Sequence, residues 1–442
     1  MSQRRWSWEA VARVTLGLAA MGVAWPVVAA TSGVQVVATP SVALYGTPFS
    51  VRVTGLRPGE PVTVKAVSTD ARNVRWESSA VFEADATGVV DLAKQAPTTG
   101  GYSGADIFGL IWSMKPLNAK SPGRAYADDE VSGWTIDYTA TDSAGSSAST
   151  RFRCVYQMPG EPLVRVPLEQ DGLYGYLYHP ARVGRFPGVI ILGGSNGGLY
   201  EWLAQAFASN GFAALTLAYF DYRDLPRELV EIPIEQFDRA TEWLKAQPSV
   251  RPDRIGIAGG SRGGELALYL ASRSNDFRAV VGWTPGEHLW EGMTKDYFKP
   301  DYVATSSWTL DGRPLPYLPW AVTPEEKERE RKGEMSSVVP LIRRALEQTD
   351  PARIEQARIR VEDIQAPILL VSGTDDQTWP SGEFCDDIEA RLKALGFHHE
   401  VTHLVLEKGG HPSFLPWLIT ANGGGGIDGG TPQGNVQGGY RS

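Results

Sequence analysis

The chain has 442 residues, of which 42% are hydrophobic, and its formal net charge at pH 7 is −9. This length allows two or three domains with sizeable buried cores. The acidic balance, without any block of Lys and Arg, argues against nucleic acid as a partner. No Cys/His cluster has the spacing of a zinc site, and we expect neither a metal nor a cofactor.

The first 30 residues have the pattern of a secretory signal peptide. Arg4 and Arg5 form a basic start, an apolar stretch covers about 14–28, and small residues precede Thr31. A membrane anchor is the alternative, but Arg13 leaves too short an apolar run to span a bilayer. We therefore expect a periplasmic or secreted protein that is not stably inserted in a membrane once the signal is removed.

Residues 31–156 are predicted to form a β domain. Short segments alternate apolar and polar residues and are separated by turn residues; they are 34–36, 49–53, 61–66, 135–141 and 149–156. Strands of this length and spacing are typical of a sandwich. Cys154 lies here and Cys385 in the next domain. We expect two buried thiols, with a disulfide between them as the alternative.

Residues 157–442 are predicted to form a second domain, of the α/β class. Continuous apolar runs, which mark strands buried on both faces, occur at 188–192, 213–217, 255–258, 279–283, 368–371 and 401–405. Helical stretches intervene at about 199–209, 235–246, 262–273 and 382–395. This alternation predicts a mostly parallel sheet with helices on both faces.

Residues from about 287 to 362 carry no strand signal and are predicted to be an insertion between two strands, where lids usually lie. A charged run from Glu325 to Lys332 inside this insertion predicts a solvated helix. The tail from residue 422 is rich in Gly and is predicted to be loop or disordered.

The candidate nucleophile is Ser261, in Gly259-Gly260-Ser261-Arg262-Gly263. This G-x-S-x-G pattern is weak by itself, but here a buried strand precedes it and a helix follows. A sharp strand-to-helix turn needs small residues on both sides and holds the serine hydroxyl above the sheet, as in α/β-hydrolases. The alternative is a Gly-rich loop with a solvated serine.

A serine hydroxyl needs a base, and in this fold the acid and then the base follow the serine along the chain. His411 follows the last predicted strand and is the candidate base. The other histidines come too early or lie inside or before that strand; they are His179, His288, His398, His399 and His403. Asp376 follows the strand at 368–371 and is the candidate orienting acid, with Asp375 as the second choice.

Two backbone N–H groups are needed to hold an oxyanion. One is expected from Arg262, directly after the nucleophile, and the other from the Gly-rich loop 193–198, with Ser195 as the best candidate. A phosphate-binding loop is the competing interpretation, but no Lys-Ser or Lys-Thr follows these glycines.

Together these motifs resemble the acyl-CoA thioesterase and bile acid-CoA:amino acid N-acyltransferase family. The resembling segments of the N-terminal part are 55–63, 84–88 and 108–114. Those of the catalytic part are 197–199, 211–213, 218–220, the Ser261 motif with Glu265, 372–376, 379–381, 409–411 and 430–432. The resemblance implies an Ig-like N-terminal sandwich, a hydrolase domain and cleavage of fatty acyl-CoA. Family members that transfer acyl groups to amino acids use Cys as nucleophile, so Ser261 points to water as the acceptor.

The sequence departs from the family at three points. Arg262 stands where the family commonly has Lys, and the chain ends at Ser442, where the family continues into a final helix. The predicted signal peptide is also at odds with a cytosolic acyl-CoA substrate.

The leading hypothesis is therefore a serine thioesterase acting on a small acyl thioester or ester. A secreted carboxylesterase or peptidase with the same three residues is the alternative, and a non-catalytic binding protein is a third hypothesis.

Overall fold

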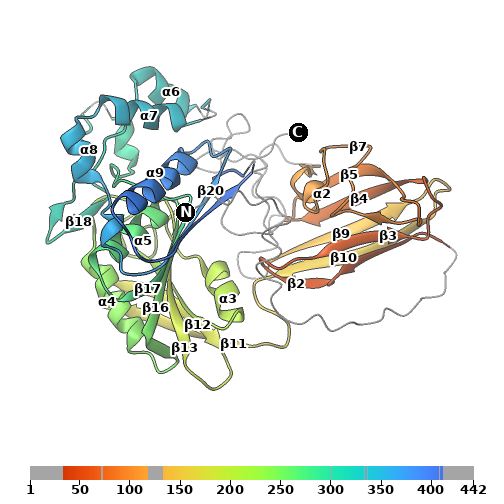
Figure 1. Ribbon diagram of the computed structural model, residues 1–442, viewed down its shortest axis with the longest axis horizontal. Helices are drawn as coiled ribbons and strands as arrows, with labels where there is room; N and C mark the ends of the chain where they lie inside the picture. The colour runs from red at the N-terminus through yellow and green to blue at the C-terminus, as the bar shows by residue number, and fades with distance from the viewer. Residues whose placement is uncertain are drawn as a thin grey trace. The chain divides into compact units, whose positions relative to one another are not determined.

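The structure is a computed structural model that describes residues 33–70, 73–117, 133–299, 301–332, 334–335, 337–407 and 409–411. The predicted signal peptide, the Gly-rich tail and the motif at 430–432 lie outside these residues. The described chain forms two compact units, which divide between Met158 and Pro159 (Figure 1). Among the helices of the described segments, none has the length and apolar character needed to cross a membrane.

The N-terminal unit consists of two β-sheets. The smaller sheet has the order β1 (Gln35–Thr39), β3 (Ser50–Thr54) and β6 (Val90–Asp91). The larger has the order β2 (Val42–Leu44), β10 (Ser147–Val155), β9 (Trp134–Thr141), β4 (Pro61–Thr69), β5 (Arg75–Glu83) and β7 (Thr99–Gly100), and β8 (Lys115–Pro116) also pairs with β5. A short helix, α2 (Gly109–Trp112), follows β7.

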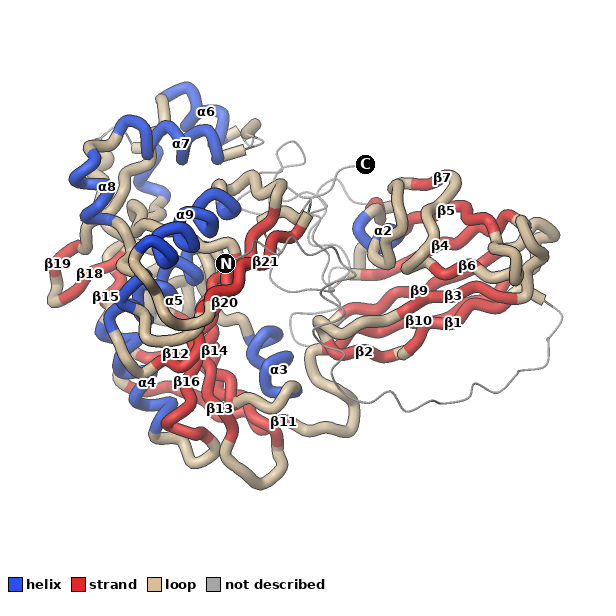
Figure 2. The backbone as a smooth tube through the Cα atoms, viewed as in Figure 1, coloured by secondary structure: helices blue, strands red, loops and turns tan. Residues whose placement is uncertain are grey.

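The two sheets of this unit share one hydrophobic core. Alternate residues along the strands are buried, as the period of two in a pleated strand requires. Val53 from the smaller sheet and Val64 and Phe152 from the larger belong to the same cluster. The strands run side by side in Figure 2, and the unit has the architecture of a β-sandwich.

The C-terminal unit, which begins at Pro159, is built on one eight-stranded sheet. Its order is β11 (Leu163–Gln170), β12 (Leu173–Pro180), β14 (Ala213–Ala218), β13 (Phe186–Leu192), β16 (Val250–Gly260), β17 (Phe277–Trp283), β20 (Ile368–Gly373) and β21 (Val401–Leu406). The pairs from β14 to β21 are parallel, and β11 and β12 are antiparallel additions at one edge. All six residues of β14 are buried, which explains its continuous apolar run.

Helices connect the parallel strands, as the sequence predicts. They are α3 (Glu201–Ser209), α4 (Glu235–Lys245), α5 (Arg262–Arg273) and α9 (Ser381–Ala394). Figure 1 shows α3 and α4 on opposite sides of the sheet. The predicted α/β class is confirmed, and the strand order together with a helix that starts directly after Ser261 is that of an α/β-hydrolase.

The insertion between β17 and β20 contains α6 (Pro324–Arg331), α7 (Val339–Gln348) and α8 (Pro351–Ala357). It also contains β18 (Trp308–Leu310) and β19 (Arg313–Pro314), which form a small sheet with β15 (Ile232–Pro233). The sequence carries no signal for these short strands. Strands of two or three residues are too short to show an alternating pattern, and β18 pairs with a segment more than 70 positions away in the sequence.

Candidate active site

Ser261 occupies a strained turn between β16 and α5. Its φ is +57° and its ψ is −123°, a conformation that residues other than Gly rarely adopt. The glycines around it leave no room for a side chain: a Cβ on Gly259 would lie 2.0 Å from the carbonyl O of Gly263, and a Cβ on Gly263 would lie 2.2 Å from that of Gly193. The backbone N–H of Ser261 donates to the carbonyl of Trp283 on β17 at 2.8 Å. The turn is thereby tied to the neighbouring strand.

The structure brings Ser261, His411 and Asp376 together in one line of hydrogen bonds. His411 Nε2 lies 2.8 Å from Ser261 Oγ, and His411 Nδ1 lies 2.9 Å from Asp376 Oδ2. All three residues are buried, and they come from the loops after β16, β20 and β21. Because these strands are parallel, their carboxyl ends lie at the same edge of the sheet. The arrangement lets the imidazole accept a proton from the hydroxyl while the carboxylate holds the opposite nitrogen.

Asp376 is held by three further donors. Ser381 Oγ donates to Oδ2 at 2.6 Å, and the backbone N–H groups of Thr378 and Trp379 donate to Oδ1 at 2.9 and 3.2 Å. These bonds fix the carboxylate so that one lone pair of Oδ2 faces His411. Asp375, the second choice from the sequence, instead accepts a hydrogen bond from the side chain of Gln377 at 2.8 Å.

The two expected oxyanion donors lie on segments that adjoin the serine. The N–H of Arg262 is at the first position of α5, where no carbonyl of the same helix can accept it. A Cβ built on Gly194 would lie 3.2 Å from the Cβ of Ser261, so the loop that carries Ser195 packs against the nucleophile. Within the described residues, the N–H of Gly194 donates to Tyr200 Oη at 3.2 Å, whereas that of Ser195 has no acceptor.

The side chain of Arg262 forms a fully buried ion pair that sequence reasoning missed. Its Nη1 donates to Glu265 Oε2 at 2.6 Å, and the two side chains are 2% and 0% exposed. The other terminal nitrogen, Nη2, donates to the carbonyl of Trp290 at 3.1 Å and to Ser307 Oγ. Burial raises the pKa of Glu265 and lowers that of Arg262, and each charge opposes the shift of the other. The first turn of α5 is thus hydrogen-bonded to Trp290 and Ser307 of the insertion.

Glu265 Oε1 is also engaged, because it accepts a hydrogen bond from Trp308 Nε1 at 2.9 Å. The signal that could have pointed to this network is the spacing of Arg262 and Glu265, which places them on one face of a helix. At most positions such a pair is exposed. Only the burial of α5 between the sheet and the insertion distinguishes it here.

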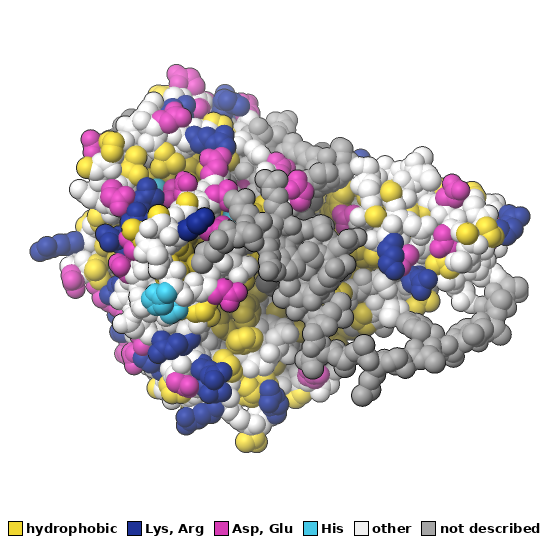
Figure 3. All heavy atoms as spheres, viewed as in Figure 1, with side chains coloured by type: hydrophobic (Ala, Val, Ile, Leu, Met, Phe, Trp, Pro, Cys, Tyr) yellow, Lys and Arg dark blue, Asp and Glu magenta, His cyan; other side chains and the backbone are white. Residues whose placement is uncertain are grey.

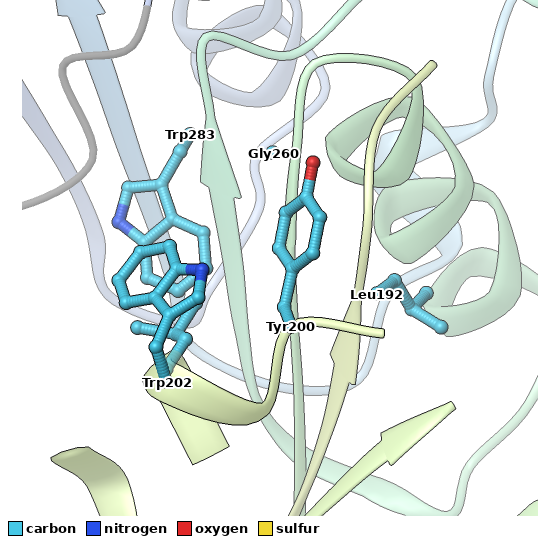
Figure 4. Close-up of a pocket in the computed structure, with 6 residues that line it drawn as sticks. Leu192, Tyr200, Trp202, Gly260 and Trp283 are labelled. Atoms are coloured by element: carbon cyan, nitrogen blue, oxygen red, sulfur yellow. The ribbon is translucent and has the colours of Figure 1, made fainter. Parts of the chain in front are cut away.

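A small apolar crevice lies beside the nucleophile. It is lined by Leu192, Tyr200, Trp202, Leu203, Gly260 and Trp283. Figure 4 shows the Tyr200 ring near Gly260, with Leu192 on one side and the two tryptophans on the other. Its walls are mainly apolar, and the space between them is too narrow for a water molecule.

Neither the surface charges nor the cysteines mark a further reactive group. On the face drawn in Figure 3, side chains of both charge signs occur over the C-terminal unit. Cys154 and Cys385 are both free and buried, so neither is presented to solvent as a reactive thiol.

Comparison with known proteins places most of the chain in one family. Residues 46–162 match the model of the acyl-CoA thioester hydrolase/BAAT N-terminal region, and residues 232–420 match that of the BAAT/acyl-CoA thioester hydrolase C terminal. Acyl-coenzyme A amino acid N-acyltransferase 1 of Mus musculus is 31% identical over 373 residues, which are 82% of each chain. Acyl-coenzyme A thioesterase 1 of Mus musculus is 29% identical over 358 residues, which are 79% of this chain and 78% of that protein.

Among solved structures, a puromycin-hydrolysing peptidase of Mycobacterium tuberculosis aligns with a TM-score of 0.40 and 14% identity, over 82% of this chain and 51% of the other. The strand order and the turn at Ser261 by themselves identify the α/β-hydrolase fold. The match to the N-terminal model precedes the match to the C-terminal model, and both kinds of relative cover most of the chain. The protein is therefore a hydrolase that belongs to the acyl-CoA thioester hydrolase/BAAT family.

Proposed function

We propose that the protein is a serine thioesterase that hydrolyses acyl-CoA, or a related acyl thioester, to a free acid and a thiol. The observation that carries the proposal is the continuous line of hydrogen bonds from Ser261 Oγ through His411 to Asp376. The thioesterases among the relatives support the choice of a thioester. The hydroxyl nucleophile of Ser261 supports water as the acceptor.

The proposed reaction has two stages that share one base. Ser261 Oγ attacks the carbonyl carbon as its proton moves to His411 Nε2, and the N–H groups of Arg262 and Ser195 hold the oxyanion. The C–S bond then breaks, the leaving thiolate takes the proton from Nε2, and an acyl ester remains on Ser261. Water next gives a proton to Nε2 and attacks the ester. Collapse of that intermediate returns the proton to Ser261 and releases the acid.

A carboxylesterase or peptidase with the same three residues is the second candidate. The predicted signal peptide favours it, because acyl-CoA is a cytosolic metabolite and an exported enzyme would meet other esters and amides. The chemistry at Ser261 would be the same for all of these substrates, and only the leaving group and its contacts would differ.

A substrate panel on the purified protein tests these alternatives. Turnover of acyl-CoA of short, medium and long chains is compared with the matching N-acetylcysteamine thioesters, simple carboxylic esters and peptide amides. We expect thioesters to have the highest kcat/KM, release of the free acid even when glycine is added, and no turnover by Ser261→Ala. A higher kcat/KM for esters or amides supports the second candidate. Full activity of Ser261→Ala would remove Ser261 from the mechanism.

A further inference from the structure

Thr284 lies at the centre of the three loops that carry the candidate catalytic residues, although nothing in the proposed chemistry uses it. It follows the last residue of β17, its side chain is fully buried, and its backbone N–H donates to the carbonyl of Val371 on β20 at 2.6 Å. The residue therefore joins the ends of two neighbouring strands of the parallel sheet.

The hydroxyl of Thr284 bonds to the loop that carries the base. Its Oγ1 donates to the carbonyl oxygen of His411 at 3.1 Å, and both groups are buried. This hydrogen bond holds the backbone of residue 411 itself, and so it restrains the point from which the imidazole projects. A buried carbonyl that loses such a donor is left without compensation, which favours movement of the loop.

The carbonyl of Thr284 bonds to the loop that carries the acid. It accepts a hydrogen bond from Trp379 Nε1 at 2.8 Å, and the N–H of Trp379 in turn donates to Asp376 Oδ1 at 3.2 Å. The Trp379 ring also meets the imidazole of His411 edge to face, with 5.9 Å between ring centroids. The preceding residue, Trp283, accepts the N–H of Ser261. One dipeptide thus contacts all three loops.

The backbone of Thr284 is strained at this position. Its φ is +42°, a value that is favourable for Gly and costly for a β-branched residue. Such strain persists only where the surroundings hold it in place. Gly would relieve the strain but could not donate to the carbonyl of His411. The threonine thus keeps the hydroxyl that bonds to His411, at the cost of the backbone strain.

We infer that Thr284 is a positioning residue for the reaction: its hydroxyl sets the place of His411 relative to Ser261, while its carbonyl, through Trp379, aligns Asp376. The inference rests on the proposed function of Ser261 and His411. Thr284 is fully buried behind the loops, so its loss is expected to alter kcat and to leave KM within about twofold. Misplacement of a base by a fraction of an ångström to 1 Å lowers kcat by about 10- to 100-fold.

The test compares three substitutions in the same thioester or ester assay. Thr284→Ser keeps the hydroxyl and is expected to retain kcat within about threefold. Thr284→Val keeps the shape without the hydroxyl, and Thr284→Gly removes both the hydroxyl and the strain; both are expected to lose about 10- to 100-fold in kcat at unchanged KM. The rate at which a fluorophosphonate labels Ser261 should fall in parallel. The matched control is Thr241→Val, which removes a buried hydroxyl that donates to a carbonyl within α4, and kcat should not change.

The outcomes separate this inference from the proposed function. If Ser261→Ala is inactive but Thr284→Val and Thr284→Gly turn over like the wild type, the positioning role is refuted and the proposed function stands. The same holds if Thr284→Ser loses as much kcat as Thr284→Val. If Ser261→Ala keeps full activity, both fall together. Should Thr284→Val be insoluble, the comparison of Ser with Gly decides: equal kcat values refute the inference, and a loss only in Gly supports it.

Discussion

The buried pair of Arg262 and Glu265 can be tested by removing each charge singly and then both. Arg262→Met keeps an apolar stem of similar shape, and Glu265→Gln keeps an acceptor for Trp308 Nε1. Each single substitution leaves one charge in a site where the two side chains are 2% and 0% exposed. Uncompensated buried charges of this kind are strongly destabilising, whereas the neutral pair is not.

The magnitude follows from these contacts. Breaking a buried ion pair by removing one partner costs about 3–5 kcal/mol of unfolding free energy. In the double variant no charge is left, and the remaining loss is that of the hydrogen bonds to the Trp290 carbonyl and Ser307, at about 1 kcal/mol each. We therefore expect the double variant to be more stable than either single variant, with a coupling energy of at least about 4 kcal/mol.

Urea unfolding provides the assay. Far-UV circular dichroism follows the secondary structure of the whole chain, and loss of fluorophosphonate labelling at Ser261 reports the unfolding of the C-terminal unit. The control is Arg273→Met, which breaks the exposed pair with Asp238 at the other end of α5, where the side chains are 29% and 46% exposed. That change should cost less than about 1 kcal/mol. Additive effects of Arg262→Met and Glu265→Gln, or a loss below about 1 kcal/mol in each, would refute the reasoning.

Three other predictions concern pH, the serine turn and the acid. Burial raises the pKa of Glu287 from 4.5 to about 7 despite the ion pair with Arg358, so the contribution of this group to stability is full below pH 4.5 and is lost as the pH rises through 7. In denaturant titrations at several pH values, the wild type should therefore lose about 3 kcal/mol of unfolding free energy relative to Glu287→Gln over that window. A difference that stays constant with pH would contradict this. Gly263→Ala should lower stability by at least about 1–3 kcal/mol, whereas Gly382→Ala, at the same second position of α9 but with its nearest atom at 3.9 Å, should not; equal melting temperatures would show that the turn has room. Asp376→Asn should lower kcat by about 10⁴-fold at unchanged stability while Asp375→Asn does not, and the opposite ranking would reassign the acid.

The parts of the fold that could be predicted from the sequence are those whose burial is uniform along the chain. The residues of β13 and β14 are apolar because both faces of the sheet are covered, so their runs stand out. The edge strand β11 was missed because it pairs on one side only and contains Pro167, which weakens the pattern of a strand. The strands β18 and β19 depend on pairing with a distant segment and have no pattern of their own.

The candidate site divides in the same way. Ser261 could be found because its requirement for glycines on both sides is local, and His411 and Asp376 because the order of strands determines which loops meet. The roles of Thr284 and of the pair formed by Arg262 and Glu265 could not be found, because they depend on contacts that close only in three dimensions. Neither a positive φ at a threonine nor the burial of a charged helix turn produces a recognisable pattern in the neighbouring sequence.

The engagement of the guanidinium of Arg262 has a consequence for how the substrate's leaving group is recognised. This cation directly follows the nucleophile, where it could be taken for the partner of a phosphate on coenzyme A. Its two terminal nitrogens already donate hydrogen bonds to Glu265, a main-chain carbonyl and a serine hydroxyl, and only 2% of the side chain is exposed to solvent. Arg262 therefore cannot supply an electrostatic preference for a nucleotide-bearing thiol, and any such preference has to come from other cations of the protein.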